Sequence, residues 1–150
     1  MNTVLRMRIE PDTDGTAELF AEVNAGRFSG VGSAWFGLAE ISSFAQSLVA
    51  KFPLPSNTCL ILQGGYWSDT NRCELKQTLL RLSVYPIGSV GAIGCRVELA
   101  RPMQNDDRPE SRTAVEVELV TDFEPLAEFS KQLDSLAKGD AGEAILRANG

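Results

Sequence analysis

Hydrophobic and polar residues alternate along much of this chain, and the alternation predicts seven β-strands. Residues 3–10, for example, place Leu5, Met7 and Ile9 between charged side chains, which is the period of two expected for a strand with one buried face. The predicted strands cover residues 3–10, 16–24, 27–36, 57–63, 72–85, 90–100 and 113–120. Because several of the connections are short turns, we expect neighbouring strands to pair antiparallel.

Two stretches have the helical period instead. Apolar residues recur at steps of three and four over residues 38–52 and again over residues 123–137, so each stretch predicts an amphipathic helix with one buried stripe. Pro53 ends the first helix, Thr121 is the predicted cap of the second, and Gly139 follows its last turn.

The order of three strands, a helix, four strands and a helix predicts an α+β fold. We expect a single curved antiparallel sheet of about seven strands, with both helices packed on its one apolar face. One domain should span residues 1–150, with its core in residues 3–138 and a C-terminal tail of residues 139–150 that adds one helical turn at residues 144–146. The opposite face of the sheet carries charged side chains and should meet water or a partner.

Two places in the predicted strands are irregular. Gly30 and Gly32 stand inside a strand, where they leave room for a bulge, for strong curvature, or for the close approach of a packed helix or another chain. We favour curvature over the helix that follows. Within residues 72–85 the apolar set changes phase, so we expect a bulge near Thr78 and Leu79.

The composition excludes several kinds of chemistry. The chain contains no histidine, so Ser–His–Asp and Cys–His catalytic sites and histidine-bound metals are excluded. Three pairs of neighbouring acids are each explained by ordinary structure, as a turn, a solvated loop and an outward strand face. They are Asp12 with Asp14, Asp106 with Asp107, and Glu116 with Glu118. We therefore expect no enzyme activity, no metal and no cofactor.

Charge and cysteine content further restrict the kind of partner and the role of the cysteines. Twenty acidic against fourteen basic residues give a net charge of −6, which disfavours nucleic acid and anionic membranes and favours a basic partner. Cys59, Cys73 and Cys95 are far apart and odd in number, so each is expected in a strand as a small buried hydrophobe. The sequence shows neither a signal peptide nor a run of about 20 apolar residues, and we expect a cytoplasmic protein.

Two loops hold the candidate partner-binding residues. Adjacent aromatic residues stand beside glycines in the loop 64–71, and several acids stand in the polar loop 101–112. The six candidates are Tyr66, Trp67, Asp69, Asp106, Asp107 and Glu110. Exposed aromatics are frequent contact residues, but Tyr66 and Trp67 could equally close one end of the core. The outer face of the sheet is the other candidate surface.

Loosely, over residues 16–137, the chain resembles a family of bacterial immunity proteins, the type associated with wall-associated toxins. The likeness lies in Ser29-Gly30-Val31-Gly32 with Trp35, Leu38, Phe44 and Leu48, in Gly91 with Ile93, Cys95 and Val97, and in Thr121-Asp122 with Leu126 and Phe129. The resemblance implies a cytoplasmic, non-enzymatic protein that binds and neutralises a cognate toxin domain. It transfers no contact residues, because such surfaces differ with each toxin.

Two other classes remain open beside a monomeric binding module. An acidic homodimeric secretion chaperone that binds an extended chain predicts an exposed apolar sheet edge or helix face and a stable dimer. A carboxylate-dependent enzyme or small-ligand binder predicts a deep pocket with converging acids.

Overall fold

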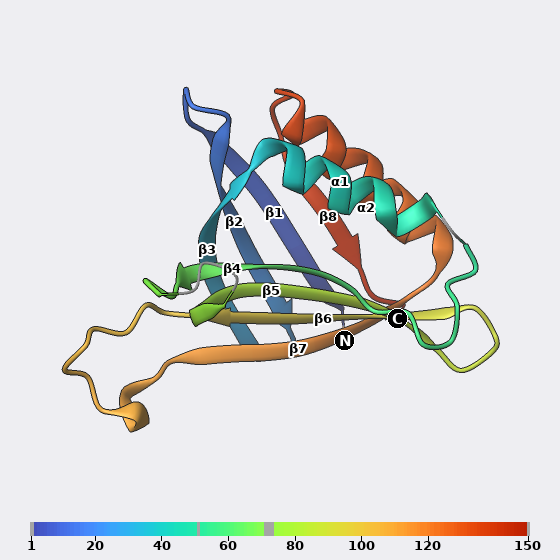
Figure 1. Ribbon diagram of the computed structural model, residues 1–150. Helices are drawn as coiled ribbons and strands as arrows, with labels where there is room; N and C mark the ends of the chain where they lie inside the picture. Colours follow the sequence, from blue (N-terminus) through green and yellow to red (C-terminus); the bar gives the residue numbers. More distant parts are fainter. Residues whose placement is uncertain (1, 51, 71–73, 150) are drawn as a thin grey trace.

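The computed structural model describes residues 2–50, 52–70 and 74–149, which form two four-stranded antiparallel sheets and two α-helices (Figure 1). The first sheet has the strand order β3-β2-β1-β8, and the second has the order β4-β5-β6-β7. The first consists of β1 (Thr3–Pro11), β2 (Thr16–Ala25), β3 (Phe28–Gly37) and β8 (Ala144–Arg147). The second consists of β4 (Leu60–Trp67), β5 (Leu75–Ile87), β6 (Ala92–Ala100) and β7 (Ala114–Thr121). The α+β class and the antiparallel pairing are confirmed.

The two helices form where the apolar stripes predict them. They are α1 (Leu38–Ala50) and α2 (Phe123–Ala137), and a short 3₁₀ helix, η1 (Pro109–Ser111), lies between β6 and β7. α1 contacts β3 and β4, whereas α2 contacts β1 and β8. The helices also contact each other, and in that interface the buried Ser130 hydroxyl donates a hydrogen bond of 2.6 Å to the carbonyl oxygen of Ala45.

The two sheets meet where β3 crosses the inner face of the second sheet. Three close approaches mark the crossing: Gly30 with Val115 of β7, Gly32 with Leu99 of β6, and Phe36 with Gly64 of β4. Figure 1 shows the first sheet standing at a steep angle to the second, with both helices on the open side of the wedge between them. Buried side chains from both sheets and both helices fill that wedge as one apolar cluster.

The prediction of a single seven-stranded sheet is wrong. The chain leaves the first sheet at the end of β3, passes through α1, and begins the second sheet at β4. Alternation shows which side chains of a strand are buried, but it does not show which strand lies beside it. The apolar faces of two sheets packed against each other therefore produce the same pattern as one sheet covered by helices.

Two local predictions are also wrong. Residues 144–147 form the edge strand β8, which pairs antiparallel with β1, and not a helical turn. A segment of four residues is too short for its apolar pattern to distinguish a strand from a helical turn. Thr121 belongs to β7 and is fully buried, and Asp122 is the residue at the N-cap of α2.

The predictions for the two irregular parts of the strands have different outcomes. The bulge is confirmed, because Gly64 of β4 pairs with Leu80 whereas the next residue, Gly65, pairs with Thr78, which leaves Leu79 unpaired. For Gly30 and Gly32 the structure shows a close approach, and the favoured use, curvature over the following helix, stays a prediction. Their missing side chains let β3 approach the second sheet, so what lies close is another part of the same chain.

Candidate functional site

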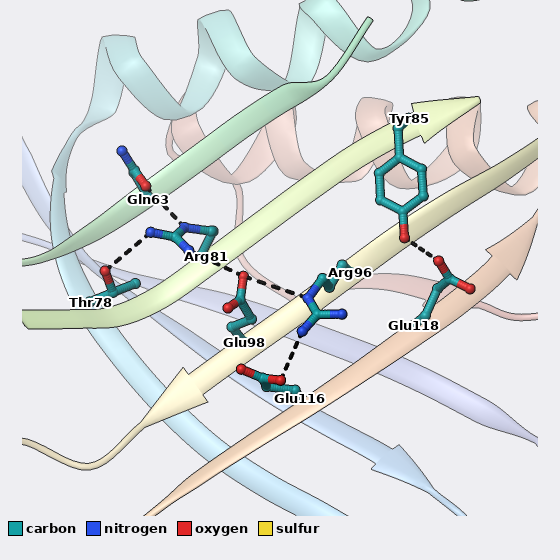
Figure 2. Close-up of polar contacts among 8 residues, drawn as sticks. All are labelled: Gln63, Thr78, Arg81, Tyr85, Arg96, Glu98, Glu116 and Glu118. Atoms are coloured by element: carbon teal, nitrogen blue, oxygen red, sulfur yellow. Dashed lines mark hydrogen bonds and ion pairs between the residues drawn. The ribbon is translucent and has the colours of Figure 1, made fainter. Parts of the chain in front are cut away.

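The outer face of the second sheet carries a ladder of paired charges (Figure 2). Arg81 of β5 donates to the Gln63 side chain at 3.0 Å, and its guanidinium lies 3.5 Å from the Glu98 carboxylate. Arg96 of β6 lies 3.9 Å from Glu98 and 2.8 Å from Glu116 of β7. The residues come from four neighbouring strands, so their alternating signs hold the register of the sheet.

Tyr85 extends the same face toward the other end of the sheet. Its phenol hydroxyl donates a hydrogen bond to the carboxylate of Glu118. Partial burial, with help from this hydrogen bond and the negative charge of Glu118, raises the pKa of Tyr85 to about 12. The polar groups of this ladder form hydrogen bonds and ion pairs with one another. The face is therefore better explained as a structural surface than as a binding site.

A groove of about 560 Å³ runs along the free edge of β3. Residues 29–35 of β3 form one side of it. The other side consists of the strand ends of the second sheet that project beyond β3, with the residues that flank the loop between β6 and β7. These are chiefly Gly65, Tyr66, Leu79, Leu99, Arg101, Pro102, Thr113 and Val115.

Large apolar side chains are exposed at the mouth of this groove. The exposed fractions are 72% for Val31, 54% for Trp35 and 50% for Tyr66, and all three residues line the groove. Phe28 at the start of β3 and Trp67 at the end of β4 are exposed as well. Such a concentration of exposed aromatic surface beside a groove is typical of a contact site.

The electrostatics of the groove are mild. Among the described residues that line it, Glu18 and Arg101 carry the charges. The Glu18 carboxylate accepts a hydrogen bond of 2.7 Å from the Ser33 hydroxyl, so its charge is partly satisfied within the first sheet. Backbone, small side chains and apolar side chains therefore dominate what the groove presents to a partner.

The loop between β6 and β7 is fixed to β5 at its beginning. The side-chain amide of Gln77 donates to the Met103 carbonyl at 2.8 Å, and its oxygen accepts from the Met103 backbone N–H at 2.9 Å. Gln77 is the β5 residue that pairs with Tyr66. This double hydrogen bond places the two loops proposed from the sequence at the same end of the second sheet.

The six predicted contact residues occupy different positions around this end. Tyr66 lines the groove, Trp67 follows it along β4, and Asp69 is exposed in the next loop. Since Tyr66 and Trp67 are 50% and 40% exposed, neither of them closes the end of the core.

The three acids of the second loop lie outside the lining of the groove. Asp107 accepts a hydrogen bond of 2.8 Å from the backbone N–H of Gln104, and Glu110 of η1 lies 3.9 Å from Arg108. Asp106, next to Asp107 in the chain, is exposed. These acids shape an exposed loop beside the groove.

Sequence reasoning missed Phe28, Val31 and Trp35. It treated residues 27–36 as a strand that curves over the next helix, so their side chains received no role on the surface. The available signal was the composition of the segment, which has no charged residue between Phe28 and Gly37. An uncharged strand can be central or can be an open edge, and only the strand order distinguishes them.

The predictions for the cysteines differ in their outcome. Cys95 is fully buried in β6, and burial raises the pKa of its thiol to about 12, as expected for a small core residue. Cys59 is exposed just before β4, so the predictions that it is buried and lies in a strand are wrong. Cys73 lies outside the described residues.

The acid pair in the first turn has the structural role that its spacing predicts. Asp14 accepts hydrogen bonds from the hydroxyl of Thr16 at 2.5 Å and from its backbone N–H at 3.1 Å. These bonds hold the pKa of Asp14 below its ordinary value. Asp12 accepts a hydrogen bond of 2.7 Å from the backbone N–H of Thr13.

Within residues 2–50, 52–70 and 74–149, no group of three or more acidic or cysteine side chains could hold a metal ion. In the same part of the chain, neither helix has the length and apolar character needed to cross a membrane. Comparisons with protein-family models, with curated proteins and with solved structures found no match to this chain.

Proposed function

We propose that this chain is a non-enzymatic protein-binding module and that its contact surface is the groove beside β3. The observation that carries the proposal is the exposure of Val31, Trp35 and Tyr66 along one groove. A protein partner that covered them would remove much apolar area from water, and aromatic residues of this kind dominate the energy of protein interfaces.

The character of the groove supports a polypeptide partner over a small molecule. Small-ligand sites enclose most of the ligand and aim several polar groups at it. This groove runs along seven consecutive residues of one strand, and its two charged residues are Glu18 and Arg101. A long, weakly charged surface with aromatic residues at its mouth suits an extended chain.

The finer form of the proposal is that the partner is a toxin domain, which this protein would neutralise. Two observations support it: the resemblance to immunity proteins, and the net charge of −6. An acidic protein attracts a basic domain by its long-range field, which raises the association rate more than the affinity.

A homodimeric secretion chaperone is the second candidate, because the exposed apolar edge at β3 is the feature which that class predicts. The two functions differ in their partners and in their oligomeric state. A stable dimer in sedimentation experiments, with a secreted protein as the partner, would favour the chaperone. A monomer that restores growth to cells producing a toxin would favour the immunity protein.

Site-specific photo-cross-linking tests the proposed surface. We expect p-benzoylphenylalanine at position 35 to form an adduct with one protein in the native host. The same reagent at position 90 is the control, because Val90 is 89% exposed but lies in the turn between β5 and β6. Equal adducts at both positions, or none at position 35, would contradict the proposal.

Expression of the cross-linked partner tests the finer form. A toxin should arrest growth when it is produced alone, and the chain should restore growth when both are produced. The Trp35→Ala variant should restore growth less well than the Val90→Ala variant. A partner that is harmless when produced alone would contradict the toxin proposal and leave the protein-binding proposal standing.

A further inference from the structure

The four sheet edges of this protein differ in how they are protected against pairing with another chain. β8 is only four residues long, β7 carries Glu116 and Glu118 on its outer face, and the β4 pairing is interrupted at two irregular positions. Short length, charge and irregular register are recognised ways of preventing edge pairing. Three of the four edges therefore have a protective feature.

β3 has none of these features. It is ten residues long, its register with β2 is continuous, and it contains neither a charged residue nor a proline. The groove of about 560 Å³ lies along this edge. β3 is thus the edge most open to an additional strand.

The hairpin geometry determines which backbone groups of β3 face the groove. Two residues, Gly26 and Arg27, connect β2 to β3, and Ala25 pairs with Phe28. A two-residue connection makes its flanking residues the first hydrogen-bonded pair, and such pairs recur at every second residue. The N–H and C=O groups of residues 29, 31, 33 and 35 consequently point away from β2.

These edge groups have no partner elsewhere in the described backbone. Outside the helices and ladders, the hydrogen bonds between described backbone groups involve none of residues 29–35. Four residues in alternate positions thus offer eight unpaired backbone groups on the groove side of the strand. That is the arrangement which a partner strand uses in β-strand addition.

The floor of the groove determines what kind of strand would fit. Leu79, Leu99 and Val115 form the floor of the groove where β3 crosses, and the second sheet continues past β3 as a shelf with Arg101, Pro102 and Thr113. A strand added beside β3 would rest one face on this shelf. Its other face would continue the outer surface of the first sheet beside Val31 and Trp35.

A second copy of this chain cannot pair there through its own β3. The β3 strand of a second copy would have to place one of its faces on the shelf. The face that would point there already packs against the second sheet of that same copy. The covering is close, because a Cβ atom at Gly30 would stand 2.5 Å from Cγ1 of Val115. The occupant must therefore be a strand that has no sheet packed on one of its faces.

We propose that the partner binds by adding one extended segment of its own chain to β3 as a fifth strand of the first sheet. The inference rests on the proposed function and names its binding mode. The segment has small or aliphatic side chains toward the shelf and larger apolar side chains beside Val31 and Trp35. Main-chain hydrogen bonds to residues 29–35 hold it, so its sequence can vary as long as this alternation is kept.

A proline at position 31 tests the role of the backbone. Val31→Pro removes an N–H that points into the groove, and the N–H groups of β3 that bond to β2 are kept. Prolines are tolerated at such positions on edge strands. Val31→Ala is the matched control, because it shortens the same side chain and keeps the N–H. The probes are 12-residue peptides selected from a displayed random library for binding to the unmodified chain.

We expect Val31→Pro to weaken the binding of the selected peptides about tenfold or more, and Val31→Ala to weaken it much less. In the unmodified chain, bound peptide should slow amide hydrogen exchange at residues 29, 31, 33 and 35 and leave the β8 amides unchanged. The exchange measurement does not depend on the folding of any variant. Thermal unfolding of both variants establishes that they are folded.

The outcomes separate this inference from the proposed function. Peptides that lose binding to a Trp35→Ala variant but bind Val31→Pro and Val31→Ala equally would overturn strand addition and leave the protein-binding surface in place. A library that yields no peptide dependent on residues 29–35 would overturn both. A dimer of the unmodified chain that Val31→Pro dissociates would overturn the choice of occupant.

Discussion

Gly30 of β3 and Val115 of β7 lie in close contact where the two sheets cross. A Cβ atom at Gly30 would lie 2.5 Å from Cγ1 and 3.1 Å from Cβ of Val115, and the three nearest heavy atoms all belong to that one side chain. The missing side chain of Gly30 is therefore matched by the branched side chain of Val115. Both residues also line the groove, so the crossing that joins the sheets also lines the proposed binding surface.

This contact predicts that Gly30→Ala destabilises the protein by about 1–3 kcal/mol, because the added methyl group overpacks the crossing. Chemical denaturation measures the change in the free energy of unfolding. Gly37→Ala is the control, since the nearest atom to an added Cβ there lies 4.0 Å away. Removing the branched methyls by Val115→Ala in the Gly30→Ala background should cost less than it does in the unmodified chain. Strictly additive effects would show that the two residues do not limit the crossing.

The helix interface predicts a moderate cost for Ser130→Ala. The Ser130 hydroxyl donates to the Ala45 carbonyl at 2.6 Å in a buried position, and the loss of such a bond lowers stability by about 0.5–1.5 kcal/mol. Ser89→Ala, at an exposed turn residue, should change the free energy of unfolding much less. Equal effects of the two substitutions would mean that the hydrogen bond between the helices contributes nothing.

Tyr85 predicts a loss of stability at high pH. Its pKa rises from the ordinary 10.0 to about 12 in the folded chain, so the unfolded state loses the phenol proton first as the pH rises. The contribution of Tyr85 to stability is complete below pH 10 and is lost as the pH rises through 12. Cys95 acts with the same sign, because burial raises its pKa from 9.0 to about 12.

Ultraviolet titration of the phenolate checks this prediction. The component that titrates near pH 12 should be absent from Tyr85→Phe. In Glu118→Gln it should shift only part of the way toward 10, because burial is the larger cause and the Glu118 hydrogen bond the smaller. A full shift to 10 in Glu118→Gln would assign the effect to the carboxylate instead.

Asp134 predicts a loss of stability on the acid side. It accepts a hydrogen bond of 2.5 Å from the Ser42 hydroxyl of α1 and one of 2.9 Å from Lys138, and these contacts lower the pKa of Asp134 below 3.8. The stabilisation is present above pH 3.8 and is lost as the pH falls through the lowered value. Carboxyl NMR titration should show a higher Asp134 pKa in Ser42→Ala. Gln46→Ala is the control, because the Gln46 amide lowers this pKa least.

Thiol labelling distinguishes the two described cysteines. In a Cys73→Ser background, a maleimide should modify Cys59 in the folded protein and Cys95 only after unfolding, since Cys59 is exposed and Cys95 is fully buried. Mass spectrometry of the labelled protein counts the modified sites. Labelling of Cys95 without denaturant would show that the second sheet opens in the native state.

The order of the strands and helices up to α2, the antiparallel pairing and the faces of most strands follow from the sequence by itself. Leu5, Met7 and Ile9 alternate with charged residues, and this local period determines which side is buried whatever the partner strand is. The bulge at Leu79 is visible for the same reason, because it changes the phase of the alternation within one strand. The sequence also predicted Tyr66 as a contact residue, from adjacent aromatics beside glycines, and the structure places Tyr66 in the lining of the groove.

Only the tertiary structure decided that the strands form two sheets and that β3 is an open edge. Both facts depend on contacts between residues far apart in the chain, such as Gly30 with Val115, and no local period encodes them. The role proposed for Trp35 depends on the same contacts. Its exposure depends on the strand order that leaves β3 at an edge and on the crossing that places the groove there. Burial of a face is a property of one segment, whereas the edge of a sheet is a property of the whole fold.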